Sequence, residues 1–320
     1  MIQYTKIISI FAAKIKSYKN IQIMNRRQFI NRSAAVVAAG SIGYLCHGCG
    51  QTQPGKRRIG IQLYSVRNNL PEDFEGTLKK LSEIGYTEVE TYGFNGDKFF
   101  DRTMKEVSVL VNDMGMTISS THCGSRMLPE DTSAPEWDNW KKISDQLKEG
   151  GGKWAILSSL PLRNPTTLDD YKRISDMFNL LGEVCRQRGT KFAFHNHYEV
   201  FGKIEDEVPL EYMIKNTDPN LVFFQLDMGH TINGGGHILN LLRTCPKRIP
   251  LWHASDFDAG IRAYIGLGQG SVPYKLMFDL PDTGGLELLT VEQESTEGDI
   301  FAKCKMDFDF LKQFKWTEVV

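Results

Sequence analysis

From Arg58 to the C-terminus, short apolar runs typical of β-strands alternate with segments whose apolar residues recur at helical spacing. Eight strand–helix units of this kind predict an α/β fold, a (β/α)8 TIM barrel, which typically needs about 250 residues. The expected strands cover residues 59–64, 87–90, 116–122, 153–157, 191–199, 221–227, 249–253 and 287–292. The expected helices lie around residues 77–81, 103–114, 137–148, 168–188, 211–216, 237–244 and 299–314.

A doubly wound open sheet is the competing fold for this pattern. It would usually carry a glycine-rich nucleotide loop after the first strand, and the segment 64–68 is not such a loop. We therefore expect one barrel domain over residues 59–320, and Gly85 is expected to end the first helix as a C-cap.

The segment before the barrel has the features of an export signal. Residues 25–30 read Asn-Arg-Arg-Gln-Phe-Ile, which resembles the twin-arginine motif, and the apolar run 33–45 that follows is too short to span a bilayer comfortably. Met24 directly precedes the motif, and we interpret it as the true start. A buried amphipathic helix is the alternative. Residues 1–58 are thus predicted to be an export signal and a linker, and the protein is expected in the periplasm.

Cys49 lies where the cleavage site of a lipoprotein would fall, in the sequence Gly-Cys-Gly. Cys46 occupies the position three residues earlier, where leucine is usual, so the match to the lipoprotein pattern is imperfect. The position of Cys49 still predicts that the protein can be attached to the membrane through a lipid on this cysteine. The Cys46–Cys49 spacing also resembles a redox pair, but no βαβ unit contains it.

Composition limits the classes of partner. Lys and Arg number 38 against 39 Asp and Glu. A nucleic-acid partner usually requires a basic face, which this balance does not provide. The four cysteines after the leader are scattered singly, without the spacing of a zinc ribbon or a disulfide framework.

Polar residues stand where nearly every expected strand ends, and the active sites of such barrels lie at those ends. Imidazole and carboxylate ligands suit Mn, Zn, Co or Fe better than an all-oxygen calcium site. If the fifth strand persists to Glu199, alternation puts His195, His197 and Glu199 on one face. The strand-end residues are Gln62, Tyr64, Glu90, His122, His195, His197, Asp227, His253 and Glu292.

Several of these residues have a plainer explanation. Hydrogen bonds into a loop would account for the two histidines of the fifth strand, and pairing with a lysine would account for Glu90. Asp227 precedes His230 in a way that suits a helix N-cap. Glu294 lies on the same face as Glu292 and competes with it.

Six short motifs lie between Gly60 and Glu294: Gly60-Ile-Gln-Leu-Tyr-Ser-Val-Arg67, His195-Asn-His197, Leu226-Asp227, His253-Ala-Ser-Asp256, Gly266-Leu-Gly-Gln-Gly270 and Val291-Glu-Gln-Glu294. With these motifs, the chain from about Gly60 to its end resembles the xylose isomerase-like barrels of the sugar phosphate isomerase/epimerase family. The resemblance implies one divalent ion, Mn, Zn, Co or Mg, held from four successive strands by His195, Asp227, His253 and Glu292.

Two positions depart from the family pattern. His195 stands where relatives have a glutamate, so His197 or Glu199 is an alternative first ligand. Ser255 stands where many relatives have a lysine that would polarise the substrate. Relatives are thought to use two glutamates as bases on opposite faces of the sugar, and one is replaced here.

The resemblance implies a metal-dependent isomerase or epimerase, or a lyase, that acts on a keto-sugar by proton abstraction next to the carbonyl, through an ene-diolate. His197, Glu292 and Glu90 are the expected catalytic residues. Export favours free or oxidised sugars and glycosides, so elimination from a 3-keto-glycoside is a variant. The residues expected to bind substrate are Gln62, Tyr64, His122, Glu199 and Asp256.

Two other functions compete with this one. A non-catalytic sugar-binding lipoprotein would explain the departures at His195 and Ser255. A repair nuclease of the endonuclease IV type would need three zinc ions and a basic DNA-facing surface, which the charge balance and the export signal argue against.

Overall fold

A computed structural model describes residues 58–245, 247–280 and 285–315. The expected export signal and linker lie outside these residues, except for Arg58. Eight parallel strands form a closed barrel in the order β1-β10-β7-β6-β5-β4-β3-β2, which confirms the predicted fold. The barrel strands are β1 Gly60–Gln62, β2 Glu88–Thr91, β3 Thr117–Cys123, β4 Trp154–Leu157, β5 Lys191–His195, β6 Val222–Asp227, β7 Leu251–Ala254 and β10 Leu288–Val291.

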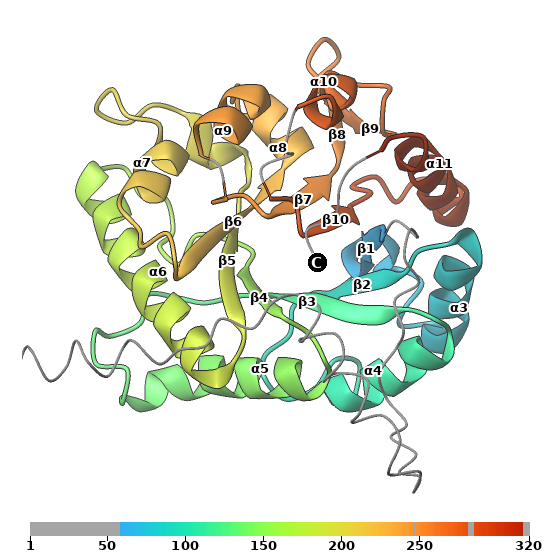
Figure 1. The fold of residues 1–320 in the computed structure, drawn as a ribbon, viewed down its shortest axis with the longest axis horizontal. Coiled ribbons are helices and arrows are strands. Elements are labelled where there is room, and N and C mark those ends of the chain that lie inside the picture. The colour runs from blue at the N-terminus through green and yellow to red at the C-terminus, as the bar shows by residue number, and fades with distance from the viewer. Residues whose placement is uncertain (1–57, 246, 281–284, 316–320) are drawn as a thin grey trace, which may run out of the picture. The chain divides into compact units, whose positions relative to one another are not determined.

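Helices surround the barrel, and Figure 1 shows them outside the ring of strands. The strands are buried, because the helices cover their outer face and side chains fill the interior. The helices are η2 Leu63–Val66, α3 Phe74–Ile84, α4 Met104–Asp113, η3 Pro135–Trp137, α5 Asp138–Glu149, α6 Leu168–Arg188, η4 Tyr198–Phe201, α7 Pro209–Lys215, α8 Met228–Asn233, α9 Ile238–Thr244, α10 Tyr274–Phe278 and α11 Ile300–Lys312.

The helix bounds follow from local capping. Thr167 and Asp170 form a capping box at the start of α6, and Gly189 ends it with a φ of 82°. Thr103 and Glu106 form the same arrangement at α4. Gly85 is the C-cap of α3, as expected.

An apolar cluster closes the barrel interior beneath the strand ends. Ala193 and Leu251 belong to it and precede His195 and His253 by two residues, so they face the same interior. The cluster consists of Trp154, Ile156, Ala193, Leu251 and Leu288. Polar side chains at the carboxyl ends therefore lie on an apolar floor.

Two strands end earlier than expected. Gln62 accepts a hydrogen bond from the backbone N–H of Tyr64 (3.0 Å), which starts η2. After His195, the side chain of Asn196 binds both backbone groups of Asp227, at 3.0 Å and 3.3 Å, in place of strand pairing. The expected alternation through Glu199 was therefore wrong, because Glu199 lies in η4.

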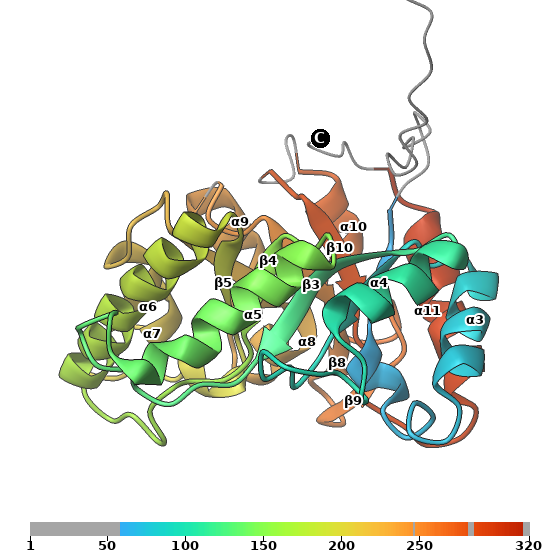
Figure 2. The same ribbon diagram turned by 90° about the horizontal axis from the view of Figure 1, so that it is seen from below.

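The sequence pattern missed several short elements. After β7 the chain forms a hairpin of β8 Asp256–Asp258 and β9 Ala263–Ile265. Figure 2 shows β8 and β9 at the lower edge of the barrel. The helices α8 and α10 were also not predicted. Within the described ranges, none of the helices combines the length and apolar character needed to cross a bilayer.

Candidate active site

Four strand ends converge at the mouth of the barrel. His195 ends β5, Asp227 ends β6, His253 lies in β7 and Glu292 follows β10. One nitrogen or oxygen atom from each of the four lies within 4.8 Å of the others, and all four side chains are buried. Barrel closure brings these residues together although 97 positions separate the first from the last in the chain, as their numbers 195 and 292 give.

The carboxylate of Asp227 has one committed oxygen and one free oxygen. Its Oδ1 accepts hydrogen bonds from the N–H of His230 (2.6 Å) and from the Ser255 hydroxyl (2.7 Å). Its Oδ2 is buried with no hydrogen-bond partner among the described residues, and lies 3.9 Å from Nδ1 of His253. A buried carboxylate oxygen without a partner is costly unless a cation lies beside it. The cluster therefore fits a divalent metal ion.

Gln225 fixes the orientation of His195. Its amide oxygen lies 2.9 Å from Nδ1 of His195, and its amide nitrogen donates to Glu90 (2.9 Å). Because an amide oxygen only accepts, Nδ1 of His195 carries the proton and Nε2 keeps its lone pair. A histidine in this tautomer is suited to bind a metal through Nε2.

Glu90 lies beneath the cluster and does not line the cavity. Burial raises its pKa, but His122 and His253 outweigh that effect and hold it well below the ordinary value. We expected Glu90 to be catalytic and Gln62 to bind substrate, but the structure places both below the cavity. The groups within hydrogen-bond distance of Glu90 are Nε2 of Gln62 (2.8 Å), Oγ of Ser120 (2.5 Å), Nε2 of Gln225 (2.9 Å), Nε2 of His253 (2.5 Å) and Nε2 of His122 (2.9 Å).

His253 bridges two carboxylates. Its Nε2 lies 2.5 Å from Glu90 and its Nδ1 lies 2.9 Å from Glu292. Burial disfavours the imidazolium, yet the two carboxylates raise the pKa of His253 well above its ordinary value. A metal bound at Nδ1 would replace the proton there, while Glu90 would continue to orient the ring.

A second pair of imidazoles lies above the cluster. The rings of His197 and His230 are 4.6 Å apart, and Nε2 of His230 lies 3.3 Å from Glu294. The Tyr264 hydroxyl contacts the other ring nitrogen of His230. Burial, and next His230, lower the pKa of His197. Burial opposes the charge on His230, but Asp227 and Glu294 raise its pKa to about 9.

The pair of imidazoles was only half predicted. The sequence pointed to His197 but treated His230 only as a neighbour of Asp227. The usable signal was the N-cap itself, because Asp227 caps α8 by accepting from the N–H of His230, which holds that residue beside the strand end. Gln225 was also missed, although it lies two residues before Asp227 and therefore on the same face of β6.

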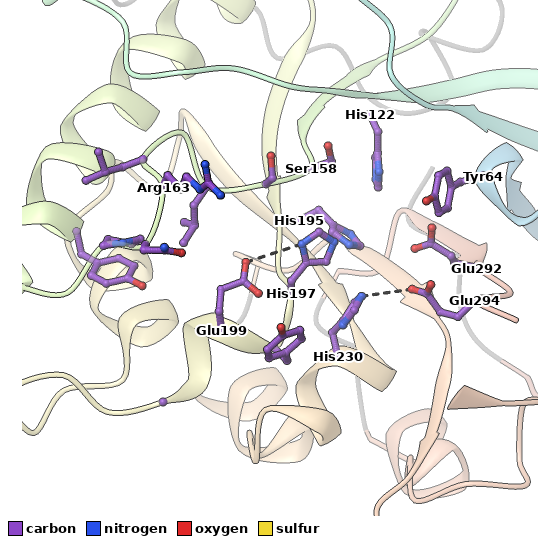
Figure 3. Close-up of a pocket in the computed structure, with 18 of the residues that line it drawn as sticks. Tyr64, His122, Ser158, Arg163, His195, His197, Glu199, His230, Glu292 and Glu294 are labelled. Carbon is purple, nitrogen blue, oxygen red and sulfur yellow. Dashed lines mark ion pairs between the residues drawn. The ribbon is translucent and has the colours of Figure 1, made fainter. Parts of the chain in front are cut away.

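A cavity of about 1090 Å³ opens at these strand ends, and His195 and Glu292 line it together with the imidazoles of His197 and His230. Figure 3 shows Tyr64 and Glu292 on one side of the histidines and Arg163 and Glu199 on the other. The wall of the cavity includes six of the residues expected at the site: Tyr64, His122, His195, His197, Glu199 and Glu292.

Asp256 does not line the cavity. Its carboxylate accepts hydrogen bonds from four backbone N–H groups, so it orders the loop after β9 instead of binding substrate. The donors are the N–H groups of Phe257 (2.9 Å), Gly268 (2.9 Å), Gly270 (3.1 Å) and Val272 (3.1 Å).

The sequence profile of the xylose isomerase-like TIM barrel family matches residues 78–313. The chain belongs to this family. Within it, the chain is 22% identical over 265 residues to an inosose dehydratase of Geobacillus kaustophilus, covering 76% of this chain and 84% of that protein. The protein is an enzyme, and sugar-type small-molecule substrates are consistent with the family.

Two solved structures share the architecture of this chain. A sugar phosphate isomerase/epimerase from Parabacteroides distasonis is 25% identical, with a TM-score of 0.71, and the match covers 82% of this chain and 96% of that one. An IolI protein with a binding zinc atom has a TM-score of 0.64 at 14% identity, with 80% of this chain and 96% of that chain covered.

The two departures from the family pattern have structural counterparts. His195 is held by Gln225, as described above. Ser255, in place of a lysine, donates to Asp227 and accepts from the N–H of Gly229 (2.9 Å). The space around Ser255 is thus used to orient a carboxylate, and the cation expected from a lysine is absent at this position.

Proposed function

We propose that this xylose isomerase-like barrel is a divalent-metal-dependent lyase that acts on a keto-sugar derivative. In the reaction, the C–H bond next to the ketone breaks and its electron pair forms a C=C bond. The C–O bond to the neighbouring substituent breaks, and the departing oxygen takes up a proton. We call His195, Asp227, His253 and Glu292 the ion-binding cluster. The observation that carries this proposal is the pair His197 and His230, which lies beside this cluster and lines the cavity.

The metal would be held by His195, Asp227, His253 and Glu292. When bound, it supplies Lewis-acid polarisation of the substrate carbonyl. Support for its presence comes from the partnerless Oδ2 of Asp227 and from the tautomer that Gln225 imposes on His195.

His197 is assigned as the general base. It lines the cavity, and no backbone or side-chain hydrogen bond with a described residue occupies its Nε2. Burial and His230 lower the pKa of His197, which favours the neutral ring. Glu199 lies 3.8 Å from Nδ1 and favours the tautomer with its proton on Nδ1, so Nε2 is left to accept a proton.

His230 is assigned as the general acid. Glu294 and Tyr264 hold its ring, and both Glu294 and His230 line the cavity. The proton on Nε2 of His230, which lies beside Glu294 at the cavity wall, is the one that would pass to the departing oxygen. Base and acid are then neighbouring side chains, so both would act from the same side of the substrate.

Elimination is favoured over epimerisation because of the position of His195. Epimerisation needs bases on both faces of the sugar, and the one lone pair that Gln225 leaves to His195, at Nε2, is assigned to the metal. Dehydration by the inosose dehydratase relatives is chemically an elimination. The second candidate is isomerisation or epimerisation in the same site, which the cavity-facing Glu292 favours as a second base.

The proposal extends to location and substrate. The twin-arginine motif at residues 25–30 supports export to the periplasm. Free or oxidised sugars and glycosides are the sugars present there, so a 3-keto-glycoside is the proposed substrate type.

The test uses a panel of 3-keto-glycosides and keto-cyclitols with metal-loaded enzyme in D2O. Elimination gives an enone that absorbs in the ultraviolet, with release of the substituent. His197→Gln and His230→Gln are each expected to lower kcat by about 100- to 10,000-fold while metal content is retained. Deuterium incorporation without release would instead establish an epimerase or isomerase. Full turnover in the presence of a chelator would refute the metal-dependent mechanism.

A further inference from the structure

The cavity extends well beyond the ion-binding cluster. Its outer part, which we call the outer subsite, lies between the loop 158–165 after β4 and the segment 198–204 that contains η4. Figure 3 shows Arg163 and Glu199 across the histidines from Tyr64 and Glu292. The outer subsite therefore lies on the side of the histidines that is opposite Tyr64 and Glu292.

The size of the cavity calls for a substrate with two parts. Pockets of about 300–1,000 Å³ hold drug-sized ligands, and this cavity measures about 1090 Å³. A single sugar ring with its carbonyl at the ion-binding cluster would leave the outer subsite to water. A second group joined to that ring would fill it.

The walls of the outer subsite are largely apolar. Tyr198 is 55% exposed, although it is a large aromatic residue, and it faces this space. An apolar body placed against such walls is removed from water, which favours binding. The apolar and aromatic residues that line this part are Leu160, Leu162, Pro165, Tyr171, Tyr198 and Ile204.

Two cations also line the outer subsite. Arg163 and Lys203 are exposed, and neither has a hydrogen bond or ion pair with any residue in the described part of the chain. Glu199 is the carboxylate in this part of the wall, and its ion-pair partner is His197, at 3.8 Å, and not Arg163 or Lys203. Arg163 therefore has a free guanidinium, which matches the two oxygens of a carboxylate in a bidentate arrangement.

The two loops are tied to their neighbours. The N–H of Met127 donates to the carbonyl of Pro161 (3.1 Å), and the N–H of Leu168 donates to the Glu205 carboxylate (3.3 Å). Ile204 and Glu207 pair across a tight turn. A wall fixed in this way loses little conformational entropy when a ligand binds.

We propose that the outer subsite binds the second part of the substrate, a largely apolar group that carries a carboxylate, and that Arg163 recognises this carboxylate. The substrate is then a keto-sugar joined to an apolar acid. The proposed function supplies the identity of the reacting sugar, but binding at the outer subsite is independent of turnover.

The test compares two glucosides that lack the keto group and so cannot react, 4-carboxyphenyl β-glucoside and phenyl β-glucoside. Isothermal titration calorimetry of the metal-loaded enzyme is expected to show the carboxylated compound binding about tenfold tighter or more, as hydrogen bonds to charged groups provide. Arg163→Met and Arg163→Glu should abolish this preference. Arg243→Glu, the same charge change on the exposed outer face of α9, should preserve it.

Equal affinity for the two glucosides in the wild-type protein would overturn the proposal. So would a preference that survives Arg163→Met, the variant that keeps an unbranched apolar side chain and removes the guanidinium with its charge and its hydrogen-bond donors. A carboxylate preference that depends on Arg163, in an enzyme that fails to turn over any keto-sugar, would support the outer subsite and count against the proposed lyase alone.

Discussion

Nδ1 of His195 lies 2.9 Å from the amide oxygen of Gln225, and the amide nitrogen of Gln225 lies 2.9 Å from Glu90. The carboxylate of Glu90 in turn contacts Nε2 of His253 and orients that ring. One glutamine side chain thus links the two imidazoles of the ion-binding cluster, and a histidine at the end of β5 can serve where the family pattern has a glutamate.

Gln225→Leu is expected to weaken metal binding by about 10- to 100-fold, because loss of a partner that orients a ligand has effects of that size. A competition titration with a metal-sensitive chelating dye measures the affinity. Gln146→Leu is the matched control, since this glutamine of α5 has no hydrogen bond at Oε1 among the described residues and lies outside the cavity wall. Unchanged affinity in Gln225→Leu would show that His195 needs no such partner, or is not a ligand.

Asp227→Asn is expected to separate the two roles of this side chain. The remaining amide oxygen can still cap α8, because asparagine is as good an N-cap as aspartate, while the amide nitrogen cannot bind a cation. Metal content should therefore fall by more than in Gln225→Leu, and the metal-free protein should unfold near the wild-type temperature.

Thermal unfolding with and without a chelator checks this prediction. Removal of the metal should lower the Tm of the wild-type protein, because a bound ligand stabilises the folded state. The chelator should leave the Tm of Asp227→Asn unchanged, because this variant has no metal to lose. A variant that retains a chelator-sensitive Tm would exclude Asp227 from the ligand set.

Asp307→Asn is expected to change how stability depends on pH. Burial raises the pKa of Asp307 in α11 to about 6, so the folded state holds this proton more tightly than the unfolded state. The stabilising contribution is complete below about pH 4 and is lost as the pH rises through about 6. The rise from 3.8 to about 6 corresponds to about 3 kcal/mol.

Urea unfolding of both proteins across this pH range gives the comparison. The free energy of unfolding of the wild type, relative to Asp307→Asn, should decrease from pH 4 to pH 6. Asp309→Asn, a change at an exposed position of the same helix, should run parallel to the wild type. Parallel curves for Asp307→Asn as well would mean that Asp307 is ionised throughout.

The double substitution Arg26→Lys and Arg27→Lys is expected to hold the protein in the cytoplasm, because the twin-arginine motif needs both arginines. Arg32→Lys, just outside the motif, serves as control. Fractionation of cells that express the full chain measures the distribution. Cys49→Ser should move exported protein from the membrane fraction to the soluble periplasmic one, and an unaltered distribution would argue against lipidation.

Local sequence determined most of the architecture. The capping boxes at Thr103 and Thr167 and the glycines after the helices specify where helices begin and end, and these signals involve residues only a few positions apart. The strand-end rule placed His195, Asp227, His253 and Glu292 among the polar residues expected on one side, because closure of a parallel barrel brings all carboxyl ends together. The family resemblance then singled out these four as a group.

Only the tertiary structure decided which of the polar residues face the cavity and which support them. Gln225 and Glu90 meet across 135 positions of the chain, and the imidazole of His253 reaches the same carboxylate across 163. Periodicity specifies the face on which a side chain lies, but the register and curvature of the closed barrel determine its neighbours. For that reason Glu90 and Asp256 resembled site residues in the sequence, whereas His230 and Arg163 emerged only from the fold.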